Sequence, residues 1–177
     1  MLSSILNMLN KNIYLIGMMG SGKSTIGTLL SKQINIPLID MDIELEKIMG
    51  MSVDSIFNEY GEKRFRMIET SLFNEITKNN VFIYATGGGI VLDKKNQKIL
   101  AGNGITIFLD CSLNILQDRL KNNLDFRPLL KDDFKKQITD IYHERYDLYK
   151  SCANFIQDTS TLTPDETITR IRKYLNV

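Results

Sequence analysis

A short run near the start of the chain combines residue types that bind phosphate. Residues 17–25 read GMMGSGKST, which fits the spacing G-x-x-x-x-G-K-S. Glycines let backbone N–H groups turn inward and form an anion site at a helix N-terminus. Lys23 can reach the β- and γ-phosphates, and the hydroxyl of Ser24 can ligate Mg²⁺. An apolar run at 13–16 and a helical pattern after the loop supply the required strand and helix, so this segment predicts a nucleoside triphosphate site.

Two aspartates follow the second apolar run, at the point where its strand should end. In open α/β sheets ligands bind at the carboxyl edge of the strands. Asp40 and Asp42 would share one face if the extended geometry continues that far. One carboxylate could then hold Mg²⁺ through water while the other meets a substrate hydroxyl. The alternative is that an aspartate here simply caps a helix.

An arginine and a glutamate three residues apart lie in the next helical stretch. Arg66 and Glu69 share a helix face at this spacing. They are either a surface ion pair or an arginine fork that Glu69 holds toward a substrate carboxylate. If Arg66 is such an arginine fork, Phe57 and Phe65 would line the substrate pocket.

Glycines and two further arginines complete the set of candidate site residues. The segment TGGG at 86–89 follows an apolar run, and three glycines at the end of a strand permit close approach of the backbone to a ligand. Arg127 lies in a polar loop at 121–132, where a lid arginine can neutralise charge on a transferring phosphoryl group. Arg145, on the helix that follows, could supply a second cation for the acceptor.

Strand-like and helix-like segments alternate along the chain, which predicts βαβ units and a parallel sheet. The expected strands span 12–17, 37–40, 81–85, 105–109 and 153–157. The expected helices span 23–33, 43–49, 52–60, 62–78, 94–101, 112–121, 133–149 and 164–175. Ser52 is expected to cap a helix, Gly61 to separate two helices and Pro164 to open the last one.

The chain length of 177 residues favours a single domain covering 1–177, with a core at about 12–175. Two segments are longer than the connection between two parallel strands requires. Residues 42–78 contain extra helices, and residues 121–132 form a polar loop between helices. Such additions predict an acceptor-binding insert and a mobile lid, respectively.

Composition excludes several classes of partner. The net charge is +1, from 22 basic and 21 acidic residues, so no global field recruits nucleic acid or an anionic membrane. The two cysteines lack metal-ligand or disulfide-framework spacing. No segment approaches the ~18 apolar residues of a membrane span, and residues 1–10 lack signal-peptide features. We therefore expect a cytoplasmic protein that binds neither nucleic acid nor membrane, and a monomer, because nothing demands a dimer.

Taken together, the motifs resemble those of shikimate kinase in order and approximate spacing, over nearly the whole chain. The matching segments are 17–25, Asp40-Met41-Asp42, Phe65-Arg66 with Glu69, Gly87-Gly88-Gly89, Arg127-Pro128-Leu129-Leu130 and Arg145-Tyr146-Asp147-Leu148-Tyr149. The resemblance implies a three-layer αβα P-loop kinase fold with a five-stranded parallel sheet in the order 2-3-1-4-5. It implies ATP-dependent phosphorylation of the 3-hydroxyl of shikimate, a step of aromatic amino-acid biosynthesis, with Mg²⁺ as cofactor.

The resemblance also implies a role for each matched residue. Catalysis would rest on Lys23, Asp42 and Arg127, and Mg²⁺ would be bound by Ser24 with Asp40 behind a water. ATP would be bound by Gly20, Ser21, Gly22, Lys23, Ser24, Thr25, Arg119 and Arg127. Shikimate would be bound by Asp42, Arg66, Glu69, Gly87, Gly88, Gly89 and Arg145.

Two alternatives stay open from the residues alone. One is a kinase for another small acceptor such as gluconate or a nucleoside monophosphate, although no aromatic base slot accompanies the arginines. The other is an ATP-binding regulator without catalysis, which would need neither the candidate base Asp42 nor the lid arginine Arg127.

Overall fold

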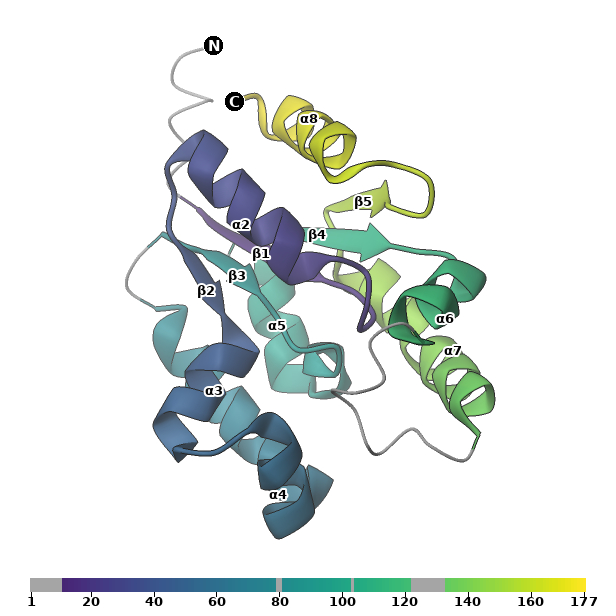
Figure 1. Ribbon diagram of the computed structural model, residues 1–177. Helices are drawn as coiled ribbons and strands as arrows, with labels where there is room; N and C mark the ends of the chain where they lie inside the picture. Colours follow the sequence, from purple (N-terminus) through teal and green to yellow (C-terminus); the bar gives the residue numbers. More distant parts are fainter. Residues whose placement is uncertain (1–10, 79–80, 103, 122–132) are drawn as a thin grey trace.

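The computed structural model describes residues 11–78, 81–102, 104–121 and 133–177. The strands are β1 (Asn12–Ile16), β2 (Leu38–Asp40), β3 (Ile83–Ala85), β4 (Gly104–Asp110) and β5 (Phe155–Asp158). The helices are α2 (Lys23–Ile34), α3 (Met41–Met49), α4 (Val53–Ile76), the 3-10 turn η1 (Ile90–Leu92), α5 (Lys94–Gly102), α6 (Leu113–Lys121), α7 (Phe134–Cys152) and α8 (Pro164–Leu175). All strand pairs are parallel, and the sheet order β2-β3-β1-β4-β5 confirms the predicted topology (Figure 1).

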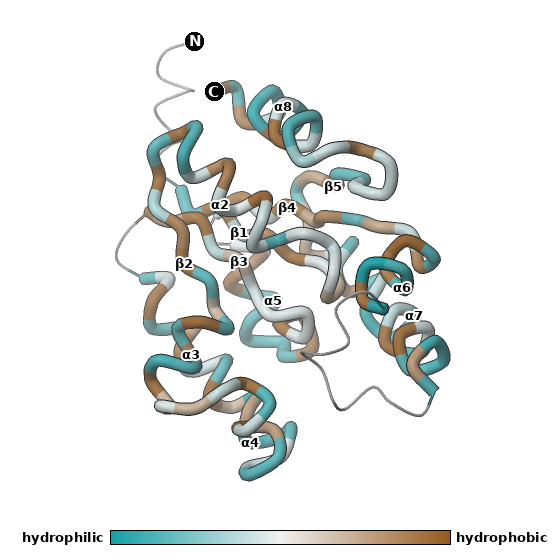
Figure 2. The backbone as a smooth tube through the Cα atoms, in the orientation of Figure 1, coloured by the Kyte–Doolittle hydropathy of each residue, from teal (hydrophilic) through white to brown (hydrophobic). Residues whose placement is uncertain are grey.

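The central strand β1 is buried on both faces, and its side chains alternate between two cores. Tyr14 and Ile16 join the cluster that includes side chains of α4, α5, α6 and α7. Ile13 and Leu15 join the cluster that α2 and α8 cover. Because successive side chains of a strand point to opposite faces, one apolar run supports both layers. The result is a three-layer αβα arrangement, in which the helices around the sheet combine hydrophilic and hydrophobic residues (Figure 2).

The predicted helix ends are confirmed by their capping contacts. Ser52 caps α4, and its side chain accepts from the Ser55 N–H. At Gly61 the backbone leaves helical geometry (φ 74°, ψ 165°), so α4 consists of two helical parts divided at the predicted residue. Thr163 and Glu166 form a reciprocal capping box at the start of α8. Among the described residues, no helix is long and apolar enough to cross a membrane.

One geometric expectation is wrong. The strand β2 ends at Asp40 and helix α3 begins at Met41, so Asp42 lies in the first turn of a helix and not on an extended strand. The physical reason is a cap: the Asp40 carboxylate accepts from the Asp42 N–H at 3.1 Å. Asp40 and Asp42 nevertheless line the same cavity, because α3 starts at the carboxyl edge of the sheet.

Candidate active site

The phosphate-binding loop joins β1 to α2 and is held in shape by its glycines. Gly17 has a φ of 142°, and a Cβ built on it would lie 2.6 Å from the carbonyl oxygen of Leu109. Gly22, which precedes the first turn of α2, is also left-handed (φ 96°, ψ 15°). Residues other than glycine rarely adopt these backbone conformations. The loop therefore brings backbone N–H groups and the helix N-terminus together as an anion site.

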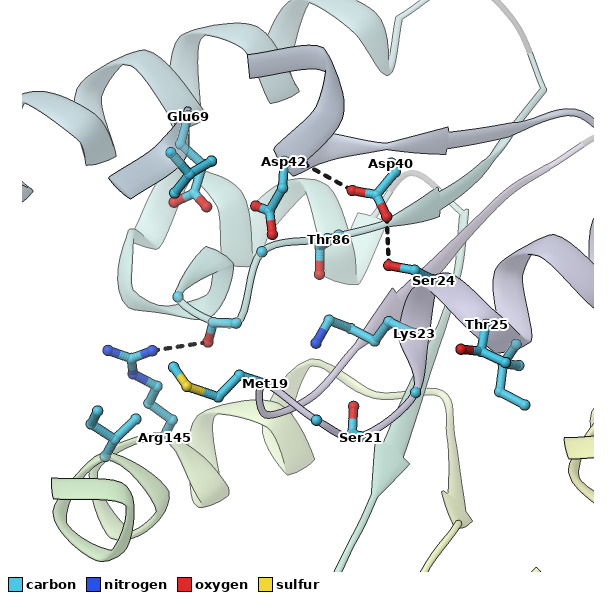
Figure 3. A pocket seen from close by; sticks show the side chains of 18 of the residues that line it. Met19, Ser21, Lys23, Ser24, Thr25, Asp40, Asp42, Glu69, Thr86 and Arg145 are labelled. Atoms are coloured by element: carbon cyan, nitrogen blue, oxygen red, sulfur yellow. Dashed lines mark hydrogen bonds between the residues drawn. The ribbon is translucent and has the colours of Figure 1, made fainter. Parts of the chain in front are cut away.

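Lys23 is buried in the first turn of α2, with 9% of its surface exposed. Its Nζ donates to the carbonyl oxygens of Gly17 and Met18, both at 2.9 Å. These contacts place the ammonium beneath the loop, and Figure 3 shows it directed toward the space that the Asp42 carboxylate also faces. A cation fixed in this way can act on phosphate oxygens without first being desolvated.

Ser24 and Asp40 meet at the end of the loop. The Ser24 hydroxyl donates to Asp40 Oδ2 at 2.5 Å, while Oδ1 of the same carboxylate caps α3 (Figure 3). The helix-cap interpretation of Asp40 is therefore confirmed, and the second carboxylate oxygen contacts the phosphate loop. The magnesium-binding interpretation stays a prediction. The pair offers hard oxygen donors of the kind that Mg²⁺ prefers. No cluster of three His, Cys, Asp or Glu residues suited to a metal occurs in the part of the chain that the structure describes.

Arg66 is held from several sides on α4. Its Nη1 pairs with Glu69 Oε2 at 2.7 Å, and its Nη2 lies 3.4 Å from Glu62 Oε1. The rings of Phe57 and Phe65 stack with centroids 4.2 Å apart, and the guanidinium carbon lies 5.0 Å from the Phe65 ring centroid. These contacts favour the arginine fork over the surface ion pair, because Glu69 is fully buried and both rings line the cavity.

Glu69 has one carboxylate oxygen in the ion pair and one without a partner. Its Oε1 is buried and makes no hydrogen bond in the described structure. Burial raises the pKa of Glu69 above the usual value for a glutamate, while the Arg66 guanidinium lowers it and the Asp42 carboxylate raises it further. A buried acceptor oxygen of this kind carries a desolvation cost unless a donor reaches it.

The glycines after β3 make room for these side chains. A Cβ on Gly89 would lie 2.2 Å from the guanidinium carbon of Arg66, and one on Gly87 would lie 2.6 Å from Glu69 Oε1. Such separations are far below van der Waals contact. A residue with a side chain at position 87 or 89 would therefore displace the Arg66–Glu69 ion pair. The protein's own Arg66–Glu69 pair therefore approaches this backbone closely, and the predicted approach of a ligand stays a prediction.

Arg145 reaches the same loop from α7. It is 7% exposed, and its Nη1 donates to the Gly88 carbonyl at 3.2 Å while its Nε donates to Glu144 at 3.3 Å (Figure 3). The structure therefore brings Arg145 to the glycine segment from more than 50 residues further along the chain. Two arginines, from α4 and α7, thus contact the glycine segment that lines the cavity.

Arg119 on α6 connects the phosphate loop to the segment after β5. Its Nη2 donates to the Thr159 carbonyl at 2.8 Å and its Nη1 to the Gly20 carbonyl at 3.3 Å. The guanidinium therefore lies beside the loop, and the ATP-binding role that the resemblance implies for it stays a prediction. Arg127 and residues 122–132 of the predicted lid lie outside the described residues, so their roles stay predictions.

One cavity of about 1200 Å³ contains both halves of the predicted site. Its lining includes the predicted residues Gly20, Ser21, Gly22, Lys23, Ser24, Thr25, Asp40, Asp42, Arg66, Glu69, Gly87, Gly88, Gly89, Arg119 and Arg145. In Figure 3 the carboxylates of Asp42 and Glu69 point into the cavity. They lie on the opposite side of the phosphate-binding loop from Thr25. The cavity thus joins a phosphate-binding end to an end with two arginines and two carboxylates.

Comparison with known proteins decides the family. Residues 19–176 match the family model described as shikimate kinase. A shikimate kinase of Caldicellulosiruptor bescii is 43% identical over 156 residues, covering 88% of this chain and 90% of that protein. The chain belongs to the shikimate kinase family. A shikimate kinase from Acinetobacter baumannii, solved in complex with shikimate, matches with a TM-score of 0.88 at 30% identity, covering 98% of this chain and 97% of the other.

A more distant likeness extends to the fold alone. A gluconokinase from Sinorhizobium meliloti 1021 matches with a TM-score of 0.60 at 13% identity. The αβα kinase fold is therefore shared with enzymes that act on other acceptors, whereas the family assignment rests on the shikimate kinases. ATP is the co-substrate that membership of this kinase family implies.

Sequence reasoning missed two residues of this shikimate kinase site. Glu62, which lines the cavity beside Arg66, lies four residues before it and was detectable as an i,i+4 partner. Tyr149, four residues after Arg145, reaches the Gly88 carbonyl with its hydroxyl. Its sequence signal was weak, because a tyrosine on an apolar helix face is ordinarily a core residue.

The buried carboxylate gives a prediction for stability against pH. Since folding raises the pKa of Glu69, the folded state binds this proton more tightly, and stability falls as pH rises through the folded-state pKa. Glu69→Gln removes that loss. The free energy of unfolding of the variant, relative to wild type, should therefore increase between about pH 4 and about pH 8 in urea titrations.

The matched control is Glu75→Gln, which removes the partner of Lys78 from an exposed ion pair on the same helix. Because this variant keeps Glu69, its stability should still fall with rising pH, as that of the wild type does. A Glu69→Gln difference that is flat or falls with pH would contradict the assignment of a raised pKa.

Proposed function

We propose that the chain transfers the γ-phosphoryl group of ATP to the 3-hydroxyl of shikimate, in the biosynthesis of aromatic amino acids. The observation that carries the proposal is the juxtaposition, in one cavity, of Lys23 on its phosphate loop with Asp42 and the buried Arg66–Glu69 pair. The first group recognises a triphosphate. The others recognise an acceptor that bears hydroxyls and a carboxylate.

Recognition of the acceptor begins with its carboxylate. Arg66 and Arg145 supply the cations for it, and Glu69 fixes the orientation of Arg66 through the 2.7 Å ion pair. The ring hydroxyls meet the Asp42 carboxylate and the backbone of Gly88 and Gly89. A polyhydroxy acid satisfies both kinds of group at once, whereas a nucleotide acceptor would need an aromatic base slot.

The ATP end uses residues 20–25 for the phosphates and Arg119 for the adenine. Ser24 and Asp40 are the residues that would hold Mg²⁺, and the hydroxyl and carboxylate oxygens of the pair suit that ion. The absence of a three-carboxylate cage among the described residues fits an ion that keeps waters and phosphate oxygens as ligands. When bound, Mg²⁺ would neutralise charge on the phosphates.

Phosphoryl transfer depends on position and charge. The acceptor hydroxyl donates a hydrogen bond to Asp42, which takes its proton as the new O–P bond forms and the bond to the leaving ADP oxygen breaks. Lys23 stabilises the negative charge on the transferring group. Arg127 would add a second cation on the prediction from family resemblance, although it lies outside the described residues.

We further propose that residues 1–177 act as one kinase domain, with residues 42–78 as its acceptor-binding insert. The protein would work as a cytoplasmic monomer that binds neither nucleic acid nor membrane. The near-neutral net charge of +1 supports the absence of an electrostatic partner surface.

A coupled assay of ADP release tests the proposed activity. Shikimate, quinate, gluconate and AMP are offered separately with ATP and Mg²⁺, and the product is identified by phosphorus NMR. We expect turnover with shikimate to exceed that with each other acceptor by at least tenfold in kcat/KM, since unpaired buried groups penalise the wrong ligand. ADP formation at the same rate without any acceptor would refute the kinase assignment.

A substitution at Arg66 separates binding from chemistry. Arg66→Ala should raise the KM for shikimate roughly 100-fold while kcat falls much less, because the lost contact is made equally in the ground and transition states. The KM for ATP should stay within about twofold. Arg64→Ala, which removes an exposed arginine two residues away, is the matched control and should leave both constants unchanged. A fall confined to kcat would show that Arg66 acts on the reacting group instead.

A further inference from the structure

Two side chains of α7 converge on one backbone carbonyl of the glycine segment. Arg145 donates to the Gly88 carbonyl oxygen from its Nη1, and Tyr149, one helical turn later, donates to the same oxygen from its hydroxyl. A carbonyl has two lone pairs, so the two donors can occupy both. The orientation of this peptide group is therefore set by α7.

The hydroxyl of Tyr149 is a buried donor whose oxygen partner is the Gly88 carbonyl. Tyr149 is fully buried and its ring stacks on Phe108 with centroids 5.1 Å apart. Burial raises the pKa of Tyr149, so the phenol is a hydrogen-bond donor at neutral pH. A donor of this kind would be costly if it were left unpaired, which makes its bond to Gly88 a strong constraint.

The constraint extends to the neighbouring N–H group. The C=O of Gly88 and the N–H of Gly89 belong to one planar peptide unit, which is trans because the described chain has no cis peptide bond. In a trans peptide these two groups point in opposite directions. With the carbonyl fixed toward α7, the Gly89 N–H is directed away from α7, and Gly89 itself lines the cavity.

The same junction touches the phosphate loop. The Tyr149 hydroxyl lies 3.8 Å from the sulfur of Met18, and a Cβ built on Gly88 would lie 3.3 Å from the Met19 nitrogen. The peptide that Tyr149 holds is thus packed directly against the loop that carries Lys23. Rotation of this peptide would change both the acceptor end of the cavity and its distance from the phosphate end.

We propose that Tyr149 is a positioning residue for phosphoryl transfer: its hydroxyl locks the Gly88–Gly89 peptide so that the Gly89 N–H donates to an acceptor hydroxyl at the correct distance from the phosphate loop. Tyr149 does not touch the acceptor. The inference rests on the proposed function, because it assigns the aimed N–H to the acceptor of that reaction.

The test is Tyr149→Phe, which removes only the hydroxyl and leaves Arg145 as a donor to Gly88. We expect kcat/KM for shikimate to fall about tenfold, the cost of one misdirected hydrogen bond, with the KM for ATP within about twofold. Tyr146→Phe is the matched control. It removes a hydroxyl from the same helix that donates to Asp110 at 3.2 Å, and it should leave both values unchanged.

Gly88→Ala provides a second route to the same peptide. The added methyl group would press on the Met19 nitrogen and move the segment while Tyr149 stays intact, so kcat/KM for shikimate should fall at least as far. In the double variant the two losses should be less than additive, since both act through one peptide group.

The outcomes separate the inference from the activity on which it rests. If the wild type does not phosphorylate shikimate, the proposed function fails first. If the wild type is active and Tyr149→Phe retains its kcat/KM, the inference is wrong. A loss that affects ATP and shikimate equally and follows the fall in Tm would show a merely structural tyrosine, and full additivity in the double variant would show that Tyr149 does not act through Gly88.

Discussion

Replacement of Lys23 with alanine should lower kcat by roughly 10²–10³-fold, because the substitution removes a fixed cation from the place where phosphoryl charge develops. The ammonium is already buried and held at 2.9 Å by two loop carbonyls, and a water molecule in its place would carry no positive charge. The measurement is single-turnover transfer from ATP to shikimate, which reports the chemical step without product release.

The control for this prediction is Lys32→Ala, which removes an exposed lysine from the last turn of the same helix. It should retain wild-type kcat. If Lys23→Ala loses only its affinity for ATP and transfers at the normal rate once saturated, the lysine contributes to binding and not to the transition state.

The second large effect is expected at Asp42. Asp42→Asn should lower kcat for shikimate by roughly 10²–10⁴-fold, because an amide cannot take the proton of the attacking hydroxyl. The exchange preserves size, and the N–H of residue 42 still donates to Asp40, so the start of α3 should stay intact. The measurement is the steady-state rate between pH 6 and pH 9. Circular dichroism checks that the variant is folded.

Asp54→Asn distinguishes a specific base from a general need for negative charge. Asp54 lines the same cavity from the first turn of α4, and its loss should change kcat by less than about threefold. Equal losses at positions 42 and 54 would indicate an electrostatic effect of the whole cavity. An Asp42→Asn enzyme with full kcat would show that Asp42 only orients the hydroxyl.

The spacing of neighbouring residues was sufficient to predict those features that depend on a short stretch of chain. The phosphate loop needs a strand, three glycines, a lysine and a serine in one run, and all of them lie within residues 13–25. The break at Gly61, the cap at Ser52 and the start of α8 at Pro164 depend on a few neighbouring residues, so their positions followed from residue type. The strand order 2-3-1-4-5 came from the family resemblance, since strand pairing joins residues far apart in the chain.

At the acceptor end of the cavity, residue spacing was not sufficient to predict the geometry. The extended geometry assumed for Asp42 was wrong because α3 begins at Met41, two residues earlier than the expected helix, and the Asp40 carboxylate caps it by accepting from the Asp42 N–H. Arg66 and Glu69 were recognised as a pair, but their spacing fits an exposed ion pair equally well. Only the packing of Glu69 beneath Gly87, with one oxygen unpartnered, separates the two cases.

The sequence by itself determined that the chain has a nucleotide site, strands that alternate with helices, and a set of arginines and carboxylates suited to a hydroxy acid, because these depend on residue types at short spacing. Tertiary structure alone decided that Tyr149 and Arg145 meet at Gly88, about 60 residues earlier in the chain. Such a contact leaves no periodic signal. It depends on how α7 packs on the sheet, and that packing is fixed by the whole apolar core, to which many residues contribute at once.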